Sequence, residues 1–297
     1  MKVVYLLGAG ASYGSLSASP SVPPLGIQLF DKLVEFSSAW ARLPADVQSE
    51  FKRADRPFEP GFELLRRTND SLLPSLLRAM GLYFLQFKPQ MGSAYIRFVD
   101  RLKSDSHQKI VATLNYDLLL DRVLASKQNG YVGYGSSVPR GQIPLLKLHG
   151  APNLVHTAPI SSTGGTFSQY VKLVDGPARF IRPDEAERRL ASDDLPPAMA
   201  LYAKGKEVLV CDEAVAQMQR EFSDALKAAD VAVVIGTAYV ADDLHVWDPL
   251  ISTDGRLLIV DPSADGFEPV VAARCGKDTR LKRMGFAEFV SQGSLVT

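Results

Sequence analysis

An apolar run that stops abruptly at polar residues and then resumes with helical spacing is the strongest constraint on the fold. Residues 109–119 read Lys-Ile-Val-Ala-Thr-Leu-Asn-Tyr-Asp-Leu-Leu. Aliphatic residues over Ile110–Leu114 predict a buried strand, and the spacing from Asp117 to Ser126 predicts a helix. Asn115 and Asp117 would therefore lie at a strand tip, where open α/β sheets bind ligands. A strand-to-helix turn with Asp117 as the helix N-cap is the simpler interpretation of the same residues.

The same alternation of apolar runs and amphipathic stretches recurs along the chain. Further strands are expected at residues 3–7, 144–148, 207–210, 231–235 and 256–260. Helical spacing predicts helices at residues 27–40, 72–87, 94–102 and 212–229. This order predicts an α/β fold: a Rossmann-like, mostly parallel sheet with helices on both faces and a helical insertion.

The predicted elements also suggest a domain organisation. Residues 1–40 and 107–297 would form the Rossmann-like domain, and residues 41–106 would form the helical insertion. Residues 15–26 are rich in serine and proline, which predicts a loop near the first strand. Residues 150–200 show no periodicity, so no element is predicted there.

Composition excludes several classes of protein. The 297 residues include 33 basic and 33 acidic side chains, so no overall field recruits nucleic acid or a membrane surface. Cys211 and Cys275 are too few for a zinc module or a disulfide framework, which favours reduced thiols in the cytoplasm. The amino terminus resembles a signal peptide, but its apolar run is short and is broken by Gly8 and Gly10. A signal peptide is therefore not expected.

Glycines directly after the first expected strand suggest a nucleotide-binding turn. Gly8 and Gly10 would let backbone amides approach phosphate oxygens. The dehydrogenase fingerprint requires a third glycine where this chain has Tyr13, and Asp31 falls inside a helix instead of at a strand tip. A hydride-transfer dehydrogenase is therefore disfavoured.

Three later strand ends also carry candidate site residues. Gly236 and Thr237 follow an apolar strand, as an ordinary tight turn or a ligand-binding loop would. Asp261 ends the next strand, where its carboxylate could accept hydrogen bonds from a ribose. His149 follows the strand at 144–148, and an imidazole suits general-base catalysis near neutral pH, although a lone histidine is more often structural.

Four segments, taken in order, resemble the SIR2-like domains, which are relatives of sirtuins. They are Gly8-Ala9-Gly10-Ala11-Ser12, Thr113-x-Asn115-Tyr116-Asp117, Lys147-Leu148-His149-Gly150 and Val234-Ile235-Gly236. The resemblance implies a Rossmann-like NAD-binding fold. Many prokaryotic members are NAD hydrolases of antiviral defence, often triggered by a partner or a phage component.

The resemblance also implies roles for individual residues. Asn115 and His149 would be catalytic, and Asp117 would contact the nicotinamide or its ribose. The remaining NAD-binding residues would be Gly8, Gly10, Ala11 and Ser12 at the pyrophosphate, Gly236 and Thr237 on the adenosine side, Asp261 at a ribose, and Thr113. No metal site is expected.

Two departures from deacylating sirtuins argue against protein deacylation, and the helical insertion agrees better with the hydrolase members. The zinc-ribbon cysteines are absent, and Pro23-Pro24-Leu25-Gly26 stands where those enzymes have Asp-Phe-Arg. The leading hypothesis is an NAD glycohydrolase that uses NAD as its substrate in antiphage defence. The alternatives are a sirtuin-type protein deacylase and a non-catalytic NAD or ADP-ribose sensor. A homo-oligomer, or a complex with an activating partner subunit, is expected to regulate the activity.

Overall fold

The chain folds into two compact units. The computed structural model describes residues 1–53, 58–136, 138–157, 176–192, 195–201, 206–263 and 265–296. The first unit comprises residues 1–23, 87–148 and 217–297, and the second comprises residues 24–86 and 149–216. The two units are defined by contacts within the chain and do not test the predicted helical insertion. The insertion at residues 41–106 therefore stays a prediction.

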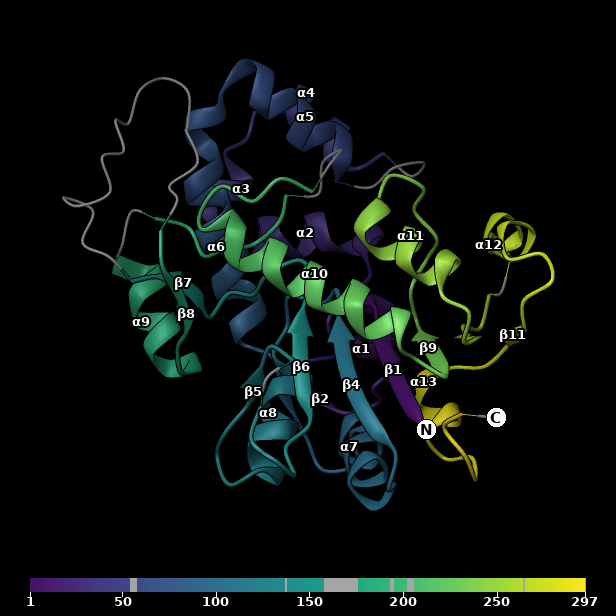
Figure 1. Ribbon diagram of the computed structural model, residues 1–297. Helices are drawn as coiled ribbons and strands as arrows, with labels where there is room; N and C mark the ends of the chain where they lie inside the picture. Colours follow the sequence, from purple (N-terminus) through teal and green to yellow (C-terminus); the bar gives the residue numbers. More distant parts are fainter. Residues whose placement is uncertain are drawn as a thin grey trace. The chain divides into compact units, whose positions relative to one another are not determined.

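A seven-stranded sheet forms the core of the first unit (Figure 1). Its strands are β1 (Lys2–Leu7), β4 (Gln108–Thr113), β5 (Gly133–Tyr134), β6 (Pro144–Lys147), β9 (Val231–Ile235), β10 (Arg256–Val260) and β11 (Thr279–Lys282). The strand order is β11-β10-β9-β1-β4-β6-β5, and every neighbouring pair is parallel. The expected α/β fold with a mostly parallel sheet is confirmed.

The first strand of the chain lies in the middle of this sheet. β1 pairs with β4 on one side and with β9 on the other, and Leu7 is the register partner of both Thr113 and Ile235. The five residues from Val3 to Leu7 are all buried, as expected for a strand covered on both faces. The chain builds the sheet outward from β1 in one direction and then in the other. Strand order therefore reverses between β1 and β9, the position at which such sheets bind ligands.

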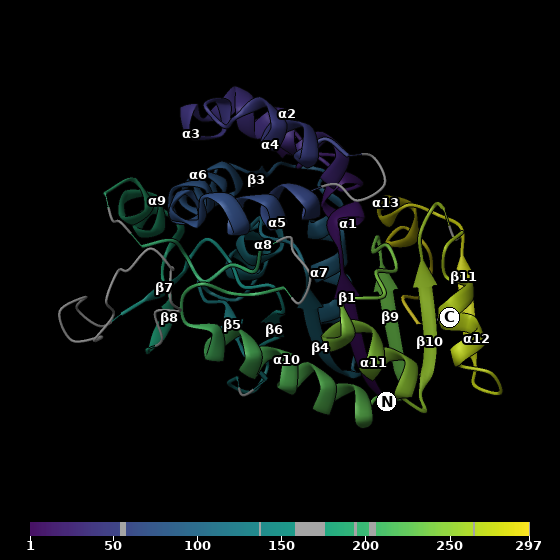
Figure 2. The same ribbon diagram turned by 90° about the horizontal axis from the view of Figure 1, so that it is seen from above.

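Helices lie on both faces of the sheet (Figure 2). One face carries α11 and the part of α10 from Gln217 onward, and the opposite face carries α7 and α8. The helices of the first unit are α1 (Ala9–Tyr13), α7 (Ala94–Ser104), α8 (Leu119–Lys127), α11 (Leu244–Ser252), α12 (Glu268–Ala273) and α13 (Phe286–Phe289), together with most of α10 (Asp212–Lys227).

The second unit is mainly helical and has an aromatic core. Its described elements are α2 (Gly26–Phe36), α3 (Ser38–Ala41), α4 (Ala45–Phe51), α5 (Glu59–Thr68), η1 (Asp70–Leu72), α6 (Leu73–Leu85), β7 (Leu154–His156), β8 (Ala178–Phe180) and α9 (Pro183–Ser192). Phe51 packs 5.2 Å from Phe30, 5.3 Å from Trp40 and 5.1 Å from Phe62, measured between ring centroids. Edge-to-face and stacked aromatic pairs of this kind stabilise a core beyond the area that they bury.

Two expected elements differ from the structure. The expected strand at 207–210 is wrong: Val208 makes only an isolated antiparallel bridge to Ala200. The expected helix at 27–40 is interrupted at Ser37, whose backbone is extended and whose hydroxyl accepts a hydrogen bond from the Ala39 amide at 3.2 Å. A serine that caps a new helix therefore ends the preceding one.

The segments without predicted periodicity contain short strands. Within residues 150–200, β7 pairs with β8 in antiparallel fashion, and α9 follows. Residues 158–175 lie outside the described part of the chain. In the expected loop at 15–26, β2 (Ala18–Ser19) pairs with β3 (Lys88–Pro89).

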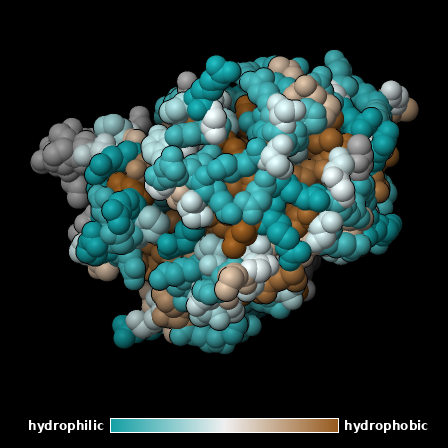
Figure 3. All heavy atoms as spheres, turned by 90° about the horizontal axis from the view of Figure 1, so that it is seen from below, coloured by the Kyte–Doolittle hydropathy of each residue, from teal (hydrophilic) through white to brown (hydrophobic). Residues whose placement is uncertain are grey.

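The surface combines polar and apolar residues. On the face seen from below, hydrophilic residues alternate with smaller hydrophobic areas (Figure 3). Among the helices of the described residues, none combines the length and the apolar character that crossing a membrane requires.

Candidate active site

The glycine loop after β1 packs directly against the turn after β9. The Gly8 amide donates to the Ile235 carbonyl at 2.9 Å, and the Gly10 amide donates to the Gly236 carbonyl at 2.8 Å. A Cβ atom on Gly8 would lie 2.6 Å from the Gly236 carbonyl oxygen, and one on Gly10 would lie 2.9 Å from the Gly236 Cα. Close backbone packing therefore explains both glycines, and their amides already have acceptors within the protein.

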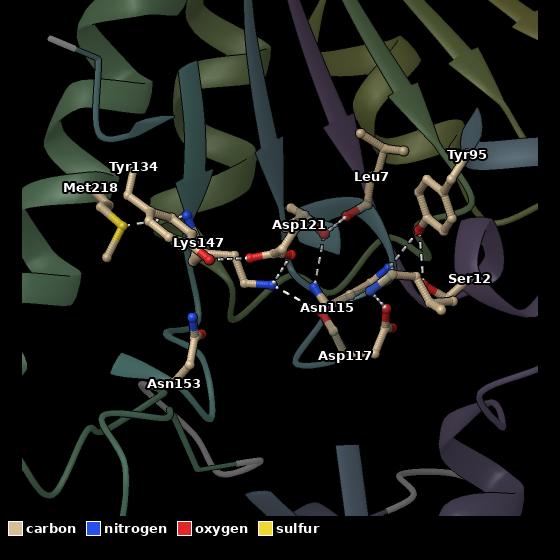
Figure 4. A network of polar contacts seen from close by, with 12 residues as sticks. Leu7, Ser12, Tyr95, Asn115, Asp117, Asp121, Tyr134, Lys147, Asn153 and Met218 are labelled. Atoms are coloured by element: carbon tan, nitrogen blue, oxygen red, sulfur yellow. Dashed lines mark hydrogen bonds and ion pairs between the residues drawn. The ribbon is translucent and has the colours of Figure 1, made fainter. Parts of the chain in front are cut away.

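Asn115 is held against the glycine loop by its side-chain amide (Figure 4). Its Nδ2 donates to the Gly8 carbonyl at 2.9 Å, to Ser12 Oγ at 2.9 Å and more weakly to Tyr95 OH at 3.4 Å. A carbonyl oxygen can only accept, so the amide nitrogen must face Gly8. The Oδ1 atom consequently faces away from the loop and has no hydrogen-bond partner within the described residues.

Ser12 connects Asn115 to Tyr95. Its Oγ lies 2.9 Å from Asn115 Nδ2 and 2.8 Å from Tyr95 OH. Burial, reinforced by the negative charge of Asp117, holds the pKa of Tyr95 well above its usual range, so the phenol keeps its proton. Ser12 therefore accepts from the Asn115 side-chain amide and links it to the Tyr95 hydroxyl.

Asp117 is a buried carboxyl group at the start of α8. Burial raises its pKa, while the Lys147 ammonium, the Ser12 hydroxyl and the Leu119 amide act in the opposite direction. Its Oδ1 accepts from the Leu119 amide at 3.1 Å. The prediction of Asp117 as the N-cap is wrong, because α8 begins two residues later than expected, at Leu119, and its N-cap is Leu118. Asp117 instead holds the first helical amide from one residue further upstream.

Thr113 joins the ends of two strands beneath Asn115. Its hydroxyl donates to the Leu7 carbonyl at 3.0 Å and accepts from the Asn115 amide at 3.1 Å. This predicted NAD-binding residue therefore has a structural function at the end of β4. The Thr113 hydroxyl orients the backbone of Asn115.

Three residues beside this cluster were given no role in the sequence analysis, although Lys147 belongs to one of the four SIR2-like segments. The fully buried Lys147 ammonium lies 3.3 Å from Asp121 Oδ2 and 3.1 Å from the Asp117 carbonyl oxygen. Tyr134 OH donates to Asp121 Oδ1 at 2.7 Å. The signal was present in the sequence, because Lys147 is a charged residue within an otherwise apolar strand.

The remaining NAD-binding candidates lie at neighbouring strand ends. Ile235 is the register partner of Leu7 and of Val260, so Gly236 and Asp261 each follow a residue in one row across the sheet. Asp261 Oδ1 accepts from the Ser263 amide at 2.9 Å, and partial burial raises the pKa of its carboxyl group. Thr237 is buried, and so is Ala11 within α1.

His149 follows β6 and is the first residue of the stretch 149–216, which belongs to the second unit. Its carbonyl oxygen accepts from the Ala200 amide at 2.9 Å, and its side chain is buried. Gly150 has a φ of +72°, and a Cβ there would lie 1.9 Å from the Ala198 carbonyl oxygen, so only glycine fits. The catalytic role of His149 stays a prediction.

A parallel sheet with a glycine loop at its strand-order reversal defines a Rossmann-like α/β protein. Within that class, the fold is that of the sirtuins. A sirtuin solved to explain sirtuin substrate affinity superposes with a TM-score of 0.50 and 15% identity, over 97% of this chain and 91% of that chain. A mutant Sir2 homologue in complex with ADP-ribose gives a TM-score of 0.48 and 17% identity, over 97% and 88%. No protein-family model and no curated protein matches the chain.

Proposed function

We propose that this chain is an NAD glycohydrolase, which cleaves NAD to nicotinamide and ADP-ribose. The observation that carries the proposal is the contact of Asn115 with the glycine loop, through the Gly8 carbonyl and the Ser12 hydroxyl at 2.9 Å each. This contact joins two of the SIR2-like segments at the carboxyl ends of the neighbouring strands β1 and β4, in a sheet with the sirtuin fold. It leaves Asn115 Oδ1 as an acceptor for a ribose hydroxyl or a water molecule.

The reaction requires few catalytic groups. The bond between C1′ of the ribose and the nicotinamide nitrogen breaks, and its electron pair stays on the nicotinamide, which leaves as a neutral base. The leaving group therefore needs no proton, unlike the alcohol released in ordinary glycoside hydrolysis. A water oxygen then bonds to C1′ and loses one proton.

Asn115 and His149 would divide the remaining tasks. Asn115 Oδ1 would orient the ribose or the water, since its amide group is held in one orientation by Gly8. His149 would accept the proton that the attacking water loses. Loss of His149 should therefore lower kcat far more than NAD affinity.

Two sequence features favour hydrolysis over protein deacylation. The two cysteines cannot form the four-cysteine zinc ribbon of deacylating sirtuins, and Pro23-Pro24 replaces part of their Asp-Phe-Arg segment. We further propose a role in antiphage defence by NAD depletion, with an activating partner subunit or self-association as the control. Both follow from the resemblance to SIR2-like hydrolases.

The test is a chromatographic assay of nicotinamide and ADP-ribose after incubation of the purified protein with NAD. Wild type is compared with Asn115→Ala and His149→Ala. The matched controls are Asn69→Ala and His107→Ala, which change the same residue types away from the strand tips at Asn115 and His149. Turnover in wild type and both controls, with loss in both site variants, is the expected result.

Other results would redirect the assignment. Release of nicotinamide only when an acyl-lysine peptide is present, with transfer of the acyl group to ADP-ribose, would establish a deacylase. Calorimetric binding of NAD without turnover, also with cell extract from phage-infected cultures added, would establish a sensor. Absence of both binding and turnover would refute an NAD site.

A further inference from the structure

Lys147 places a fully buried ammonium group at the end of β6, the strand between β4 and the edge strand β5. It contacts the Asp121 carboxylate at 3.3 Å and the Asp117 carbonyl oxygen at 3.1 Å, and Asp121 is itself 4% exposed. Tyr134 OH donates a hydrogen bond to the other carboxylate oxygen, Asp121 Oδ1, at 2.7 Å (Figure 4). The charge is thus paired and hydrogen-bonded on the α8 side of the strand tip.

A buried ion pair of this kind is not explained by stability alone. Removing two charges from water costs about as much free energy as their attraction returns, and well-packed hydrophobic replacements are often equally stable. Such a pair is better suited to selecting one conformation of the backbone to which it is bonded. The relevant backbone here is the connection between β4 and α8.

Residues 115–117 of that connection belong neither to the strand pairing of β4 nor to the helical hydrogen bonds of α8. The first helical bond of α8 runs from the Arg122 amide to the Leu118 carbonyl at 2.9 Å, so the Asp117 carbonyl precedes the helix. The Lys147 ammonium is its donor. The Asn115 amide is held by Thr113 Oγ1 at one end, and the Leu119 amide is held by Asp117 Oδ1 at the other.

We propose that Lys147 is a positioning residue that holds the turn 115–119 in the conformation that presents Asn115 to the substrate. Asp121 and Tyr134 fix the ammonium group, and the ammonium fixes the Asp117 carbonyl. For catalysis, this inference rests on the proposed NAD hydrolase activity. Its effect on the backbone can be measured without any ligand.

The first experiment separates positioning from stability. Lys147→Met alone leaves a buried, unpaired carboxylate on Asp121 and should lower the melting temperature. In the double variant Lys147→Met with Asp121→Leu, the unpaired Asp121 carboxylate is removed as well, and the melting temperature should recover relative to Lys147→Met. Turnover of NAD in this double variant should still fall by about 10- to 100-fold in kcat, because the donor to Asp117 is absent.

The second experiment needs no activity. Hydrogen exchange of the Asn115 and Leu119 amides should be at least about 10-fold faster in the double variant, with unchanged exchange in β1 and β10. Thr279→Val is the matched control, because it removes a 3.0 Å hydrogen bond to buried Arg274 elsewhere in the first unit. It should leave exchange at Asn115 and Leu119 unchanged.

The outcomes distinguish the two proposals. If wild type does not cleave NAD but exchange at the turn accelerates, the hydrolase assignment fails and the positioning role stands. If the double variant is stable with unchanged exchange, or with unchanged kcat in an active enzyme, the positioning role is wrong. If the double variant does not fold, Tyr134→Phe serves instead, and it should accelerate exchange at the same two amides; no acceleration would overturn the inference.

Discussion

Gly10 donates its backbone amide to the carbonyl oxygen of Gly236 across 2.8 Å. A Cβ atom on Gly236 would lie 2.4 Å from the Ala11 amide nitrogen, so no side chain fits on either side of this contact. The loop after β1 and the turn after β9 are therefore joined backbone to backbone. The geometry of the strand tips depends on this contact.

Gly10→Ala should destabilise the protein by about 1–3 kcal/mol, as expected for a methyl group forced against backbone atoms. The new Cβ would lie 2.9 Å from both the Cα and the carbonyl oxygen of Gly236. Gly285→Ala is the control, because no atom lies within 4 Å of its Cβ position. Urea denaturation of both variants measures the difference; equal midpoints would contradict the contact.

Asn115→Asp should cost about 1–3 kcal/mol at neutral pH, because a carboxylate oxygen would face the Gly8 carbonyl without a proton between them. The cost should shrink in acid, where a protonated carboxyl can donate. The exposed Asn69→Asp should change stability by less than about 0.5 kcal/mol at either pH. Chemical denaturation at two pH values decides, and a pH-independent cost at position 115 would argue against the amide orientation.

The paired substitutions Tyr95→Phe and Tyr5→Phe should change stability differently. Tyr95 OH is hydrogen-bonded to Ser12 at 2.8 Å, whereas the buried Tyr5 hydroxyl has no partner within the described residues. Removing the bonded hydroxyl should cost about 1 kcal/mol, and removing the unpaired one should be neutral or stabilising. Thermal melting of the two variants tests this, and a larger loss at position 5 would refute it.

Asp117 should make stability depend on pH in a defined direction. Burial raises its pKa in the folded state above the ordinary aspartate value of 3.8, so the folded protein binds more protons than the unfolded chain in the interval between the two values. The contribution of Asp117 to stability is therefore full below the ordinary pKa and is lost as pH rises through the folded-state pKa. Asp117→Asn removes this dependence, so its denaturation midpoint should rise relative to wild type between pH 4 and pH 8. A constant difference across that range would show that the folded-state pKa is not raised.

Buried parallel strands were predictable from sequence, and edge strands were not. Val231–Ile235 and Arg256–Val260 were identified residue for residue because central strands are continuous apolar runs. β11 (Thr279–Lys282) carries charged residues at the sheet edge, and β5 has only two residues, so neither gives an apolar signal.

The candidate residues could be named one by one from the sequence, but their hydrogen-bond network could not. Asn115 and Asp117 were placed at a strand tip, and Ser12 was named through the resemblance to SIR2-like domains. Tyr95 lies at the start of an amphipathic helix, where its ring has the spacing of a core residue, and nothing in the sequence indicates that its hydroxyl reaches Ser12. Contacts between residues far apart in sequence depend on the three-dimensional fold.

The central place of β1 also orders events during synthesis. β1 is made first, its neighbour β4 only at residues 108–113, and its other neighbour β9 only at residues 231–235. Pairing between distant segments must wait until both have left the ribosome. Gly10 therefore has no partner until residue 236 has been translated, so the joining of the two strand ends on either side of this contact is a late event in synthesis.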